Sequence, residues 1–336
     1  MNEKLNEILA KNNMNWEVEK VPIRYGDNPI LTEEYNGIIR SDNGRLLGIV
    51  GNNYEPKNNA ELFQHFSPFL DVENTQWNCF EMNGGRKICL EGYFKNIQAD
   101  VSKGDTVGLR MQIISGHAGA CSTRPSLDLL RLICLNGATM MVRNGNMISR
   151  IKHTPSQDGK LQQVEVYLKQ AMLDFDAQVE IYRSMQHTRF SKMDFQKFVL
   201  ELFPPTEKKI LDSKEKLQQV NPTKSVSLDD VLSVTEHRAS TSGDVLDLGL
   251  LPKSERERYD IIQDLLPRQA GQLEELFEAG KGSEFSRGTL YGAYNAVTEY
   301  IDHHRSRDSS DRESAILGSG ADLRSRAYDL AVSRLS

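Results

Sequence analysis

The chain has 336 residues, of which 26% are charged and 38% are hydrophobic, and its net charge is −6. This length allows one large domain or two smaller ones with a substantial core. No apolar run approaches the roughly 20 residues of a membrane span, and the N-terminal segment MNEKLNEILAKNNMNW has no apolar signal core. We therefore expect a cytoplasmic protein that does not associate with a membrane.

The N-terminal part is patterned as one helix followed by strands. A short helix is predicted over residues 2–13, and the alternation of WEVEKVPI predicts a half-buried strand over 16–23. Two apolar runs, 37–40 and 45–50, flank the turn sequence Ser-Asp-Asn-Gly. This arrangement is typical of a β-hairpin.

A second helix and a second hairpin are predicted next. Asn58 and Glu61 have the spacing of a capping box, which would open a helix that runs to Phe69. Two further strands are expected over 76–82 and 87–95, because the sequence Asn-Gly-Gly between them favours a tight turn.

The stretch 103–154 lies at the centre of the predicted fold. It begins with a strand over 106–115, which ends at the turn sequence Gly-His-Ala-Gly. Pro125 and Ser126 then resemble a helix start, and the apolar residues up to Cys134 predict a helix that ends at an Asn-Gly pair. A second extended piece is expected over 147–153.

The charge of this stretch is one-sided, with seven basic and two acidic side chains in a chain of net charge −6. Cations along a groove bind nucleic acid largely without regard to sequence. The candidate nucleic-acid contacts are Arg110, Arg124, Arg131, Arg143, Arg150 and Lys152, with His117 and His153. The alternative is a solvated basic face that the acidic C-terminal half balances.

Four cysteines are too widely spaced for a CxxC zinc or redox motif. A zinc site can be composed from His117, Cys121, Cys134 and His153, since zinc prefers thiolate and imidazole ligands. However, Cys134 lies in an apolar run, where a free cysteine behaves as a small hydrophobe. We therefore favour buried thiols over a metal site.

The sequence carries no nucleophile, metalloprotease, phosphate-loop or dinucleotide-binding motif, so we expect neither an enzyme nor a bound cofactor. A hydrolase that uses His117 and His153 is the least favoured function. The helical spacing of Glu299, Asp302 and His303 would suit a cation, but a charge-paired helix end explains it as well.

The C-terminal half is predicted to be helical. A long helix over 161–185 carries an apolar stripe that is typical of a core or an oligomer contact; the stripe consists of Leu168, Met172, Phe175, Val179 and Tyr182. Further helices are expected over 193–203, 271–279, 285–304 and 321–335.

Residues 206–265 are rich in Lys, Glu, Asp and Ser and lack a sustained apolar stripe. The predicted division is therefore an α+β core domain at 1–205, a polar insertion or linker at 206–265, and a helical C-terminal segment at 266–336 that packs on the core.

Several segments together resemble one family; they are LGIVGNNYEPKNNAELF (47–63), RLICLNG (131–137), ISRIKHT (148–154), AYNAVTEYIDHH (293–304) and AILGSGADLRSRA (315–327). They are similar to the phage/plasmid-like proteins described as domain of unknown function 932. The resemblance covers 15–205 and 270–335 and leaves the insertion outside. Members commonly carry an Asp-Gly pair where this chain has Ala118-Gly119, so the role of that acidic residue does not transfer.

The predicted order of helix, three antiparallel strands and helix is also similar to the core of Rad52-type single-strand annealing proteins. This second likeness is an analogy of fold. The predicted elements indicate an α+β fold with an antiparallel sheet, packed helices and a helical C-terminal part, and the likeness implies a β-β-β-α core within it.

We therefore expect a phage or mobile-element protein that binds single-stranded DNA or RNA in the host cytoplasm and acts in recombination or replication. A homo-oligomer, such as a ring, would fit the Rad52-type likeness. The alternative is an interaction protein that inhibits a host defence or replication factor.

Overall fold

The computed structural model describes residues 3–25, 30–64, 66, 74–117, 121–133, 136–138, 173–206, 208–209, 212, 263–305 and 309–335. The chain forms two compact units, of which the first comprises residues 1–180 and 305–318 and the second 181–304 and 319–336. These boundaries differ from the predicted ones at 205 and 266, and most of the predicted insertion at 206–265 lies outside the described residues.

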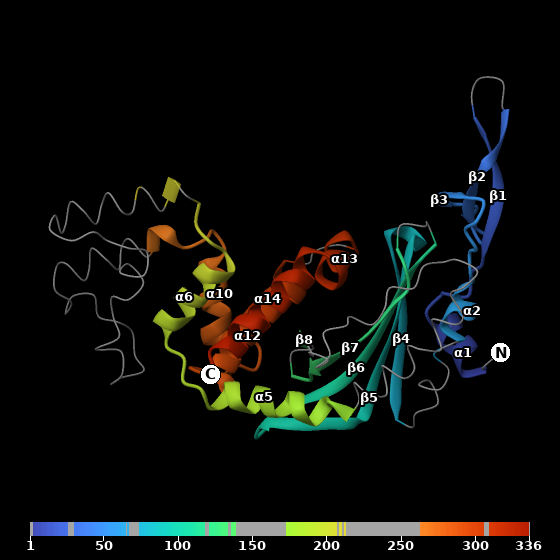
Figure 1. Ribbon diagram of the computed structural model, residues 1–336. Coiled ribbons are helices and arrows are strands. Elements are labelled where there is room, and N and C mark those ends of the chain that lie inside the picture. Colours follow the sequence, from blue (N-terminus) through green and yellow to red (C-terminus); the bar gives the residue numbers. More distant parts are fainter. Residues whose placement is uncertain are drawn as a thin grey trace, which may run out of the picture. The chain divides into compact units, whose positions relative to one another are not determined.

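The first unit begins with a small α+β layer (Figure 1). Its antiparallel sheet has the order β1-β2-β3. The elements are α1 (Glu3–Lys11), β1 (Val18–Tyr25), β2 (Ile30–Arg40), β3 (Leu46–Gly51) and α2 (Asn59–Gln64). The predicted N-terminal helix, the strand at 16–23 and the hairpin around the Ser-Asp-Asn-Gly turn are confirmed.

The start of α2 shows how side chains join this layer together. The Glu61 carboxylate accepts a hydrogen bond from the Asn58 backbone N–H at 2.9 Å, which is one half of the predicted capping box. The Asn58 side chain does not complete the box, because its Oδ1 accepts from the Val18 N–H at 2.9 Å. The helix start is therefore attached to the first strand.

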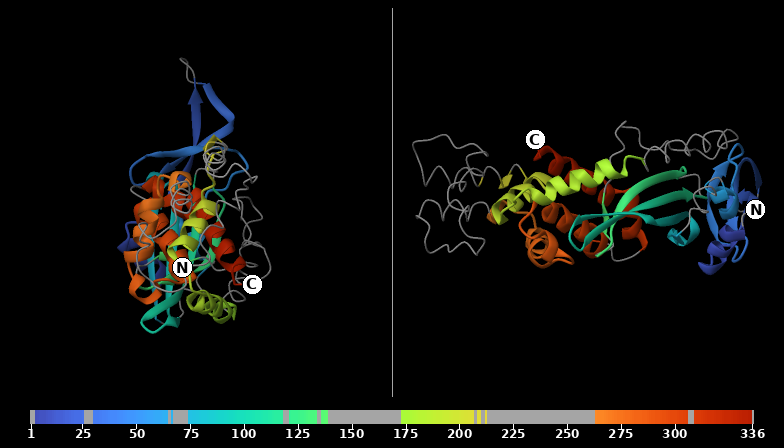
Figure 2. Two further views of the ribbon diagram at one scale, coloured as in Figure 1. Left: turned by 90° about the vertical axis from the view of Figure 1, so that its left-hand side faces the viewer. Right: turned by 90° about the horizontal axis from the view of Figure 1, so that it is seen from below.

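The second sheet of this unit has five antiparallel strands in the order β4-β5-β6-β7-β8 (Figures 1 and 2). They are β4 (Thr75–Met82), β5 (Lys87–Ser102), β6 (Asp105–Gly116), β7 (Arg124–Arg131) and β8 (Asn136–Ala138). The 3₁₀ turn η1 (Asn83–Gly85) joins the first two, with φ of 52° at Asn83, 63° at Gly84 and 92° at Gly85. The Asn-Gly-Gly sequence supplies the residues that tolerate this left-handed backbone.

The helix predicted from Ser126 is wrong, because these residues form β7. Their burial alternates with period two: Leu127 and Leu129 are buried, whereas Ser126 and Asp128 on the opposite face are half-buried. In the described part of the chain β8 pairs with residues 129–131 and does not reach Pro125, so Pro125, which has no N–H to donate, is tolerated there. A fourth strand thus follows the third, and the Rad52-like β-β-β-α core is not confirmed. The extended piece predicted at 147–153 lies outside the described residues.

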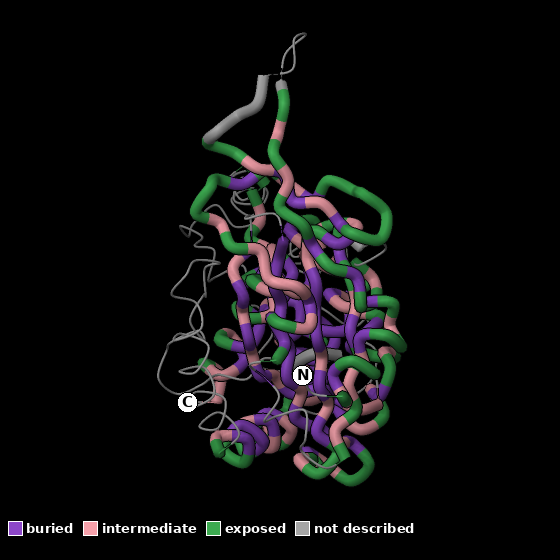
Figure 3. Tube along the Cα trace, turned by 90° about the vertical axis from the view of Figure 1, so that its right-hand side faces the viewer, coloured by how far each residue is buried: buried purple, intermediate pink, exposed green. Residues whose placement is uncertain are grey.

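The two faces of the five-stranded sheet differ in character. One face is apolar and buried, and Figure 3 shows long buried segments along the strands; its residues include Ile88, Leu90, Leu109, Met111, Ile113, Leu127 and Leu129. On the other face an apolar cluster of Met82, Cys89, Ile114 and Cys121 packs against Ile316 and Leu317. These two residues are the last two of α13 (Ser309–Leu317). Beyond this cluster, that face also carries the polar side chains of Glu91, Arg110, Gln112 and Asp128.

The second unit is helical, and the predicted helices at 193–203, 271–279 and 321–335 are confirmed. Its elements are α6 (Lys192–Leu202), α10 (Ala270–Ala279), α11 (Ser283–Ser286), α12 (Leu290–Glu299), the π-helical turn η3 (Tyr300–His304) and α14 (Ser319–Ser333), while α5 (Phe175–His187) passes from the first unit into it. The helix predicted over 285–304 is interrupted at Gly288, where φ is +69°. None of the described helices is long and apolar enough to cross a membrane.

The apolar stripe of α5 is core in the described part of the chain. Phe175, Val179 and Tyr182 are at most 4% exposed. The Tyr182 ring packs on three other buried tyrosines at centroid distances of 5.5 to 6.2 Å. These side chains are therefore covered by their own chain, and Leu168 and Met172 of the predicted stripe lie outside the described residues.

Candidate functional site

The polar face of the five-stranded sheet carries the predicted residues of the central stretch. The strand register places Tyr93, Arg110 and Asp128 in one row across β5, β6 and β7. The adjacent row contains Glu91 and Gln112. Because alternate residues of a strand point to one side, these five side chains share a face.

Arg110 is held by carboxylates on both sides. Its Nε and Nη2 donate to the two oxygens of Asp128 at 2.8 and 2.5 Å, and its Nη1 lies 3.8 Å from Glu91. Gln112 donates to the same Glu91 carboxylate at 2.6 Å. The arginine and both carboxylates have side chains that are only 16–17% exposed. The guanidinium is thus positioned and neutralised within the sheet.

Tyr93 completes this row. Its ring lies across Gly108, where a Cβ would come within 2.4 Å of it. The Tyr93 hydroxyl oxygen is buried and makes no hydrogen bond, and burial raises the pKa of this phenol. The tyrosine ring therefore packs on the backbone of β6 at Gly108.

Arg131 lies on the opposite, buried face. Its Nε and Nη2 donate to the Asp105 carboxylate at 2.8 and 2.5 Å, and the two side chains are 1% and 0% exposed. In a helix, Asp128 would lie one turn from Arg131, but in a strand it points to the other face, where it pairs with Arg110. In this structure a phosphate cannot reach Arg131.

Arg124 differs from these two arginines. It is half-buried at the start of β7, its Nε is buried without a hydrogen-bond partner, and no ion pair to it occurs among the described residues. Lys103, in the turn between β5 and β6, is exposed. The other predicted contacts, Arg143, Arg150, Lys152 and His153, lie outside the described residues.

His117 is completely buried and serves as a packing residue. Its Nε2 lies 2.9 Å from Oδ1 of Asn59. The Asn59 amide nitrogen donates to the Met14 carbonyl at 2.9 Å, so Oδ1 accepts and His117 Nε2 carries the proton. The imidazole also packs edge-on against Trp16 at 5.2 Å. This buried histidine therefore lies between the N-terminal segment and the end of β6.

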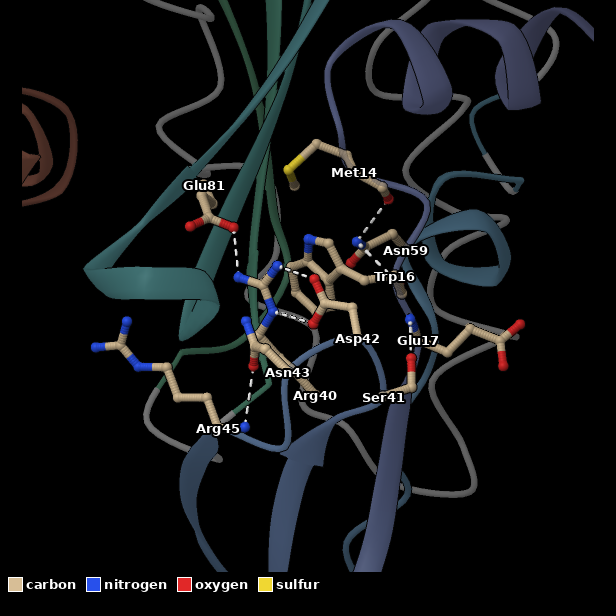
Figure 4. A network of polar contacts seen from close by, with 10 residues as sticks. All are labelled: Met14, Trp16, Glu17, Arg40, Ser41, Asp42, Asn43, Arg45, Asn59 and Glu81. Carbon is tan, nitrogen blue, oxygen red and sulfur yellow. Dashed lines mark hydrogen bonds and ion pairs between the residues drawn. The ribbon is translucent and has the colours of Figure 1, made fainter.

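A polar network around Arg40 was not predicted (Figure 4). The Arg40 guanidinium is 4.2 Å above the Trp16 ring. It donates to Asp42 at 2.9 and 2.7 Å and to Glu81 at 2.7 Å. The hydrogen bond to Asp42 raises the pKa of Arg40 and lowers that of Asp42. Because Glu81 belongs to β4, the network joins the two sheets. The Arg-Ser-Asp sequence hints at the local pair, but nothing in the sequence pairs Arg40 with Glu81.

The described residues contain no group of three or more His, Cys, Asp or Glu side chains arranged for a metal ion. Cys121 is buried, whereas Cys134 and His153 of the predicted zinc set lie outside the described residues. Glu299 accepts from the Lys281 N–H at 3.0 and 3.2 Å, and Asp302 pairs with Arg324. These two carboxylates serve different structural contacts.

Comparison with known proteins gives one match. The family model described as domain of unknown function (DUF932) matches residues 46–229 and 232–333. No curated protein and no solved structure matches the chain. The match begins at β3 and includes most of residues 206–265, which the sequence comparison had left outside. Since it covers most of both compact units, the chain belongs to the family described as domain of unknown function (DUF932).

Proposed function

We propose that the chain binds single-stranded nucleic acid through cations of the stretch 103–154, in the host cytoplasm and as a phage or mobile-element protein. Annealing in recombination or replication is the activity that this binding would serve. One observation carries the proposal. The two acidic residues of this stretch, Asp105 and Asp128, are both engaged by arginines, Arg131 and Arg110.

The pairing narrows the set of candidate contacts. Apart from the paired Arg131 and Arg110, the stretch contains five cations and no further acidic residue. These cations are Lys103, Arg124, Arg143, Arg150 and Lys152. The excess positive charge of the stretch therefore resides on them. A protein cation that contacts a phosphate releases counterions condensed on the nucleic acid, and this release favours binding.

The extent of β6 indicates how such a contact would run. Lys103 precedes β6, and Arg124 lies opposite Ile114 near its end. The nine residue steps between Asp105 and Ile114 span about 30 Å at roughly 3.3 Å per residue. A single strand that contacts both cations would therefore run along the sheet, so we expect affinity to rise with oligonucleotide length over this span.

The test is a titration of labelled single-stranded oligonucleotides at several salt concentrations. Arg124→Gln and Lys103→Gln should each lower the slope of log K against log salt by about 0.7. Arg24→Gln is the matched control, because Arg24 is an exposed cation outside the stretch. If the parent chain does not bind at low salt, or if the control changes the slope as much, the proposal is wrong. Inhibition of a host factor then becomes the function to test, by capture of the partner.

A further inference from the structure

The outer face of the three-stranded sheet is apolar and exposed. Tyr35, Leu46 and Ile49 are 51%, 48% and 57% exposed and are three of the four large hydrophobic side chains with high exposure among the described residues. The register places them on one face, because Tyr35 lies opposite Gly51, Gly37 opposite Ile49 and Ile39 opposite Leu46. An exposed apolar group of this kind marks an interaction surface.

Gly37 is at the centre of this face. A Cβ there would lie 3.1 Å from Leu46, 3.3 Å from Val21 and 3.7 Å from Ile23. The absence of a side chain lets these apolar groups from β1 and β3 meet over β2. Their side chains therefore lie close together on the outer face of the sheet.

The two edges of this sheet are built differently. β1 is protected against strand addition, since Pro22 offers no N–H, Lys20 and Arg24 are charged, and the Val18 N–H is already bonded to Asn58. β3 has the sequence LLGIVG, without charge or proline. Among the described residues it pairs only with β2, and no strand of that part of the chain lies along its other edge.

We propose that two copies of the chain associate by antiparallel pairing of β3 with β3. An uncharged edge can pair with a copy of itself without placing like charges opposite each other. Antiparallel pairing of identical strands also gives a closed two-fold interface. The result is a six-stranded sheet in which the exposed Leu46 and Ile49 of both copies form one apolar face. This inference is independent of nucleic-acid binding.

The test uses opposite charges at Ile49 in the full chain. Ile49→Lys and Ile49→Glu should each be monomeric by light scattering, whereas the parent is a dimer. Mixing the two variants should restore the dimer, because unlike charges then face each other across the strand pair. Restoration by mixing also shows that both variants are folded. Ile23→Lys is the control, since it places a charge on the same face at the protected edge.

The proposal is overturned if the parent remains a monomer at protein concentrations up to about 100 times a micromolar Kd. It is equally overturned if Ile49→Lys remains dimeric, if mixing does not restore the dimer, or if Ile23→Lys is as disruptive as Ile49→Lys. Loss of the dimer in both Ile49 variants, recovery on mixing and an intact Ile23→Lys dimer together support it.

Discussion

Arg131 and Asp105 form an ion pair with two hydrogen bonds, 2.8 and 2.5 Å long, within the apolar face of the five-stranded sheet. Both side chains are essentially inaccessible to solvent. The pair links the start of β6 to the end of β7. Its position makes it a structural element of the sheet, although Arg131 belongs to the most basic stretch of the chain.

Arg131→Gln should therefore destabilise the first unit, because it leaves the Asp105 carboxylate buried without its partner. The expected loss is about 3–5 kcal/mol of unfolding free energy. The double variant Arg131→Met/Asp105→Leu should recover most of it, since no buried charge remains. Urea unfolding measures both, with Lys103→Gln in the adjacent turn as a control that should match the parent. An unchanged midpoint for Arg131→Gln would mean that the pair is not buried in solution.

Variants of Arg110 and Arg124 should distinguish an arginine that stabilises the fold from one that contacts nucleic acid. Arg110 is bound by Asp128 and lies beside Glu91, so Arg110→Gln should cost stability of about 1–3 kcal/mol and leave the salt slope of binding unchanged. Arg124 has no such partner among the described residues, so Arg124→Gln should lower the slope and leave stability within about 0.5 kcal/mol. Unfolding experiments and oligonucleotide titrations on the same two variants test both expectations. The opposite pattern would mean that Arg110, and not Arg124, contacts the phosphate.

The parts of the fold that local sequence determines were predicted correctly. Both hairpins have turn residues between alternating runs, and each strand partner is only a few residues away. The segment after Pro125 was assigned the wrong structure because its short apolar run Leu127, Leu129 and Leu130 fits a helix and a buried strand equally well. The neighbouring strand decides between them, and sequence periodicity alone does not contain that information.

The site residues were predictable only as residue types. A basic stretch can be counted, but which of its arginines are neutralised depends on strand register. In a helix, Arg131 would pair with Asp128; in a strand, the two side chains point to opposite faces. The contact of His117 with Asn59 joins residues 58 positions apart. No spacing rule connects such pairs, because they form only when the layers pack.

The Cys79 thiol should be unreactive at alkaline pH. Burial, with a smaller effect from the Glu91 carboxylate, raises its pKa to about 12. In a Cys134→Ser background, in which the remaining cysteines are all buried, alkylation by iodoacetamide should not accelerate between pH 7 and pH 10. The folded state holds this proton more tightly than the unfolded state, whose thiol has a pKa of about 8.5. Its contribution to stability is therefore complete below that value and is lost as the pH rises toward 12. A reactivity midpoint near pH 8.5 would show that Cys79 is exposed in solution.

The Arg40 network should control the environment of Trp16, one of only two tryptophans in the chain. The guanidinium contacts the indole ring and binds two carboxylates, Asp42 in the turn after β2 and Glu81 in β4. Arg40→Lys keeps the charge but loses the planar group that stacks on the ring and reaches both carboxylates. In a Trp77→Phe background, Arg40→Lys should therefore shift Trp16 emission to longer wavelength, as water enters, and lower the unfolding midpoint.

Arg45→Gln is the matched control for this experiment. Arg45 is an exposed arginine in the same hairpin and forms no ion pair among the described residues. Glu81→Gln should produce a smaller shift than Arg40→Lys, because the pair with Asp42 and the contact with Trp16 remain in place. If Arg40→Lys leaves the emission and the midpoint of the parent unchanged, the network does not join the two sheets. If Arg45→Gln produces the same shift, the effect comes from the charge of the hairpin and not from the contact with the indole.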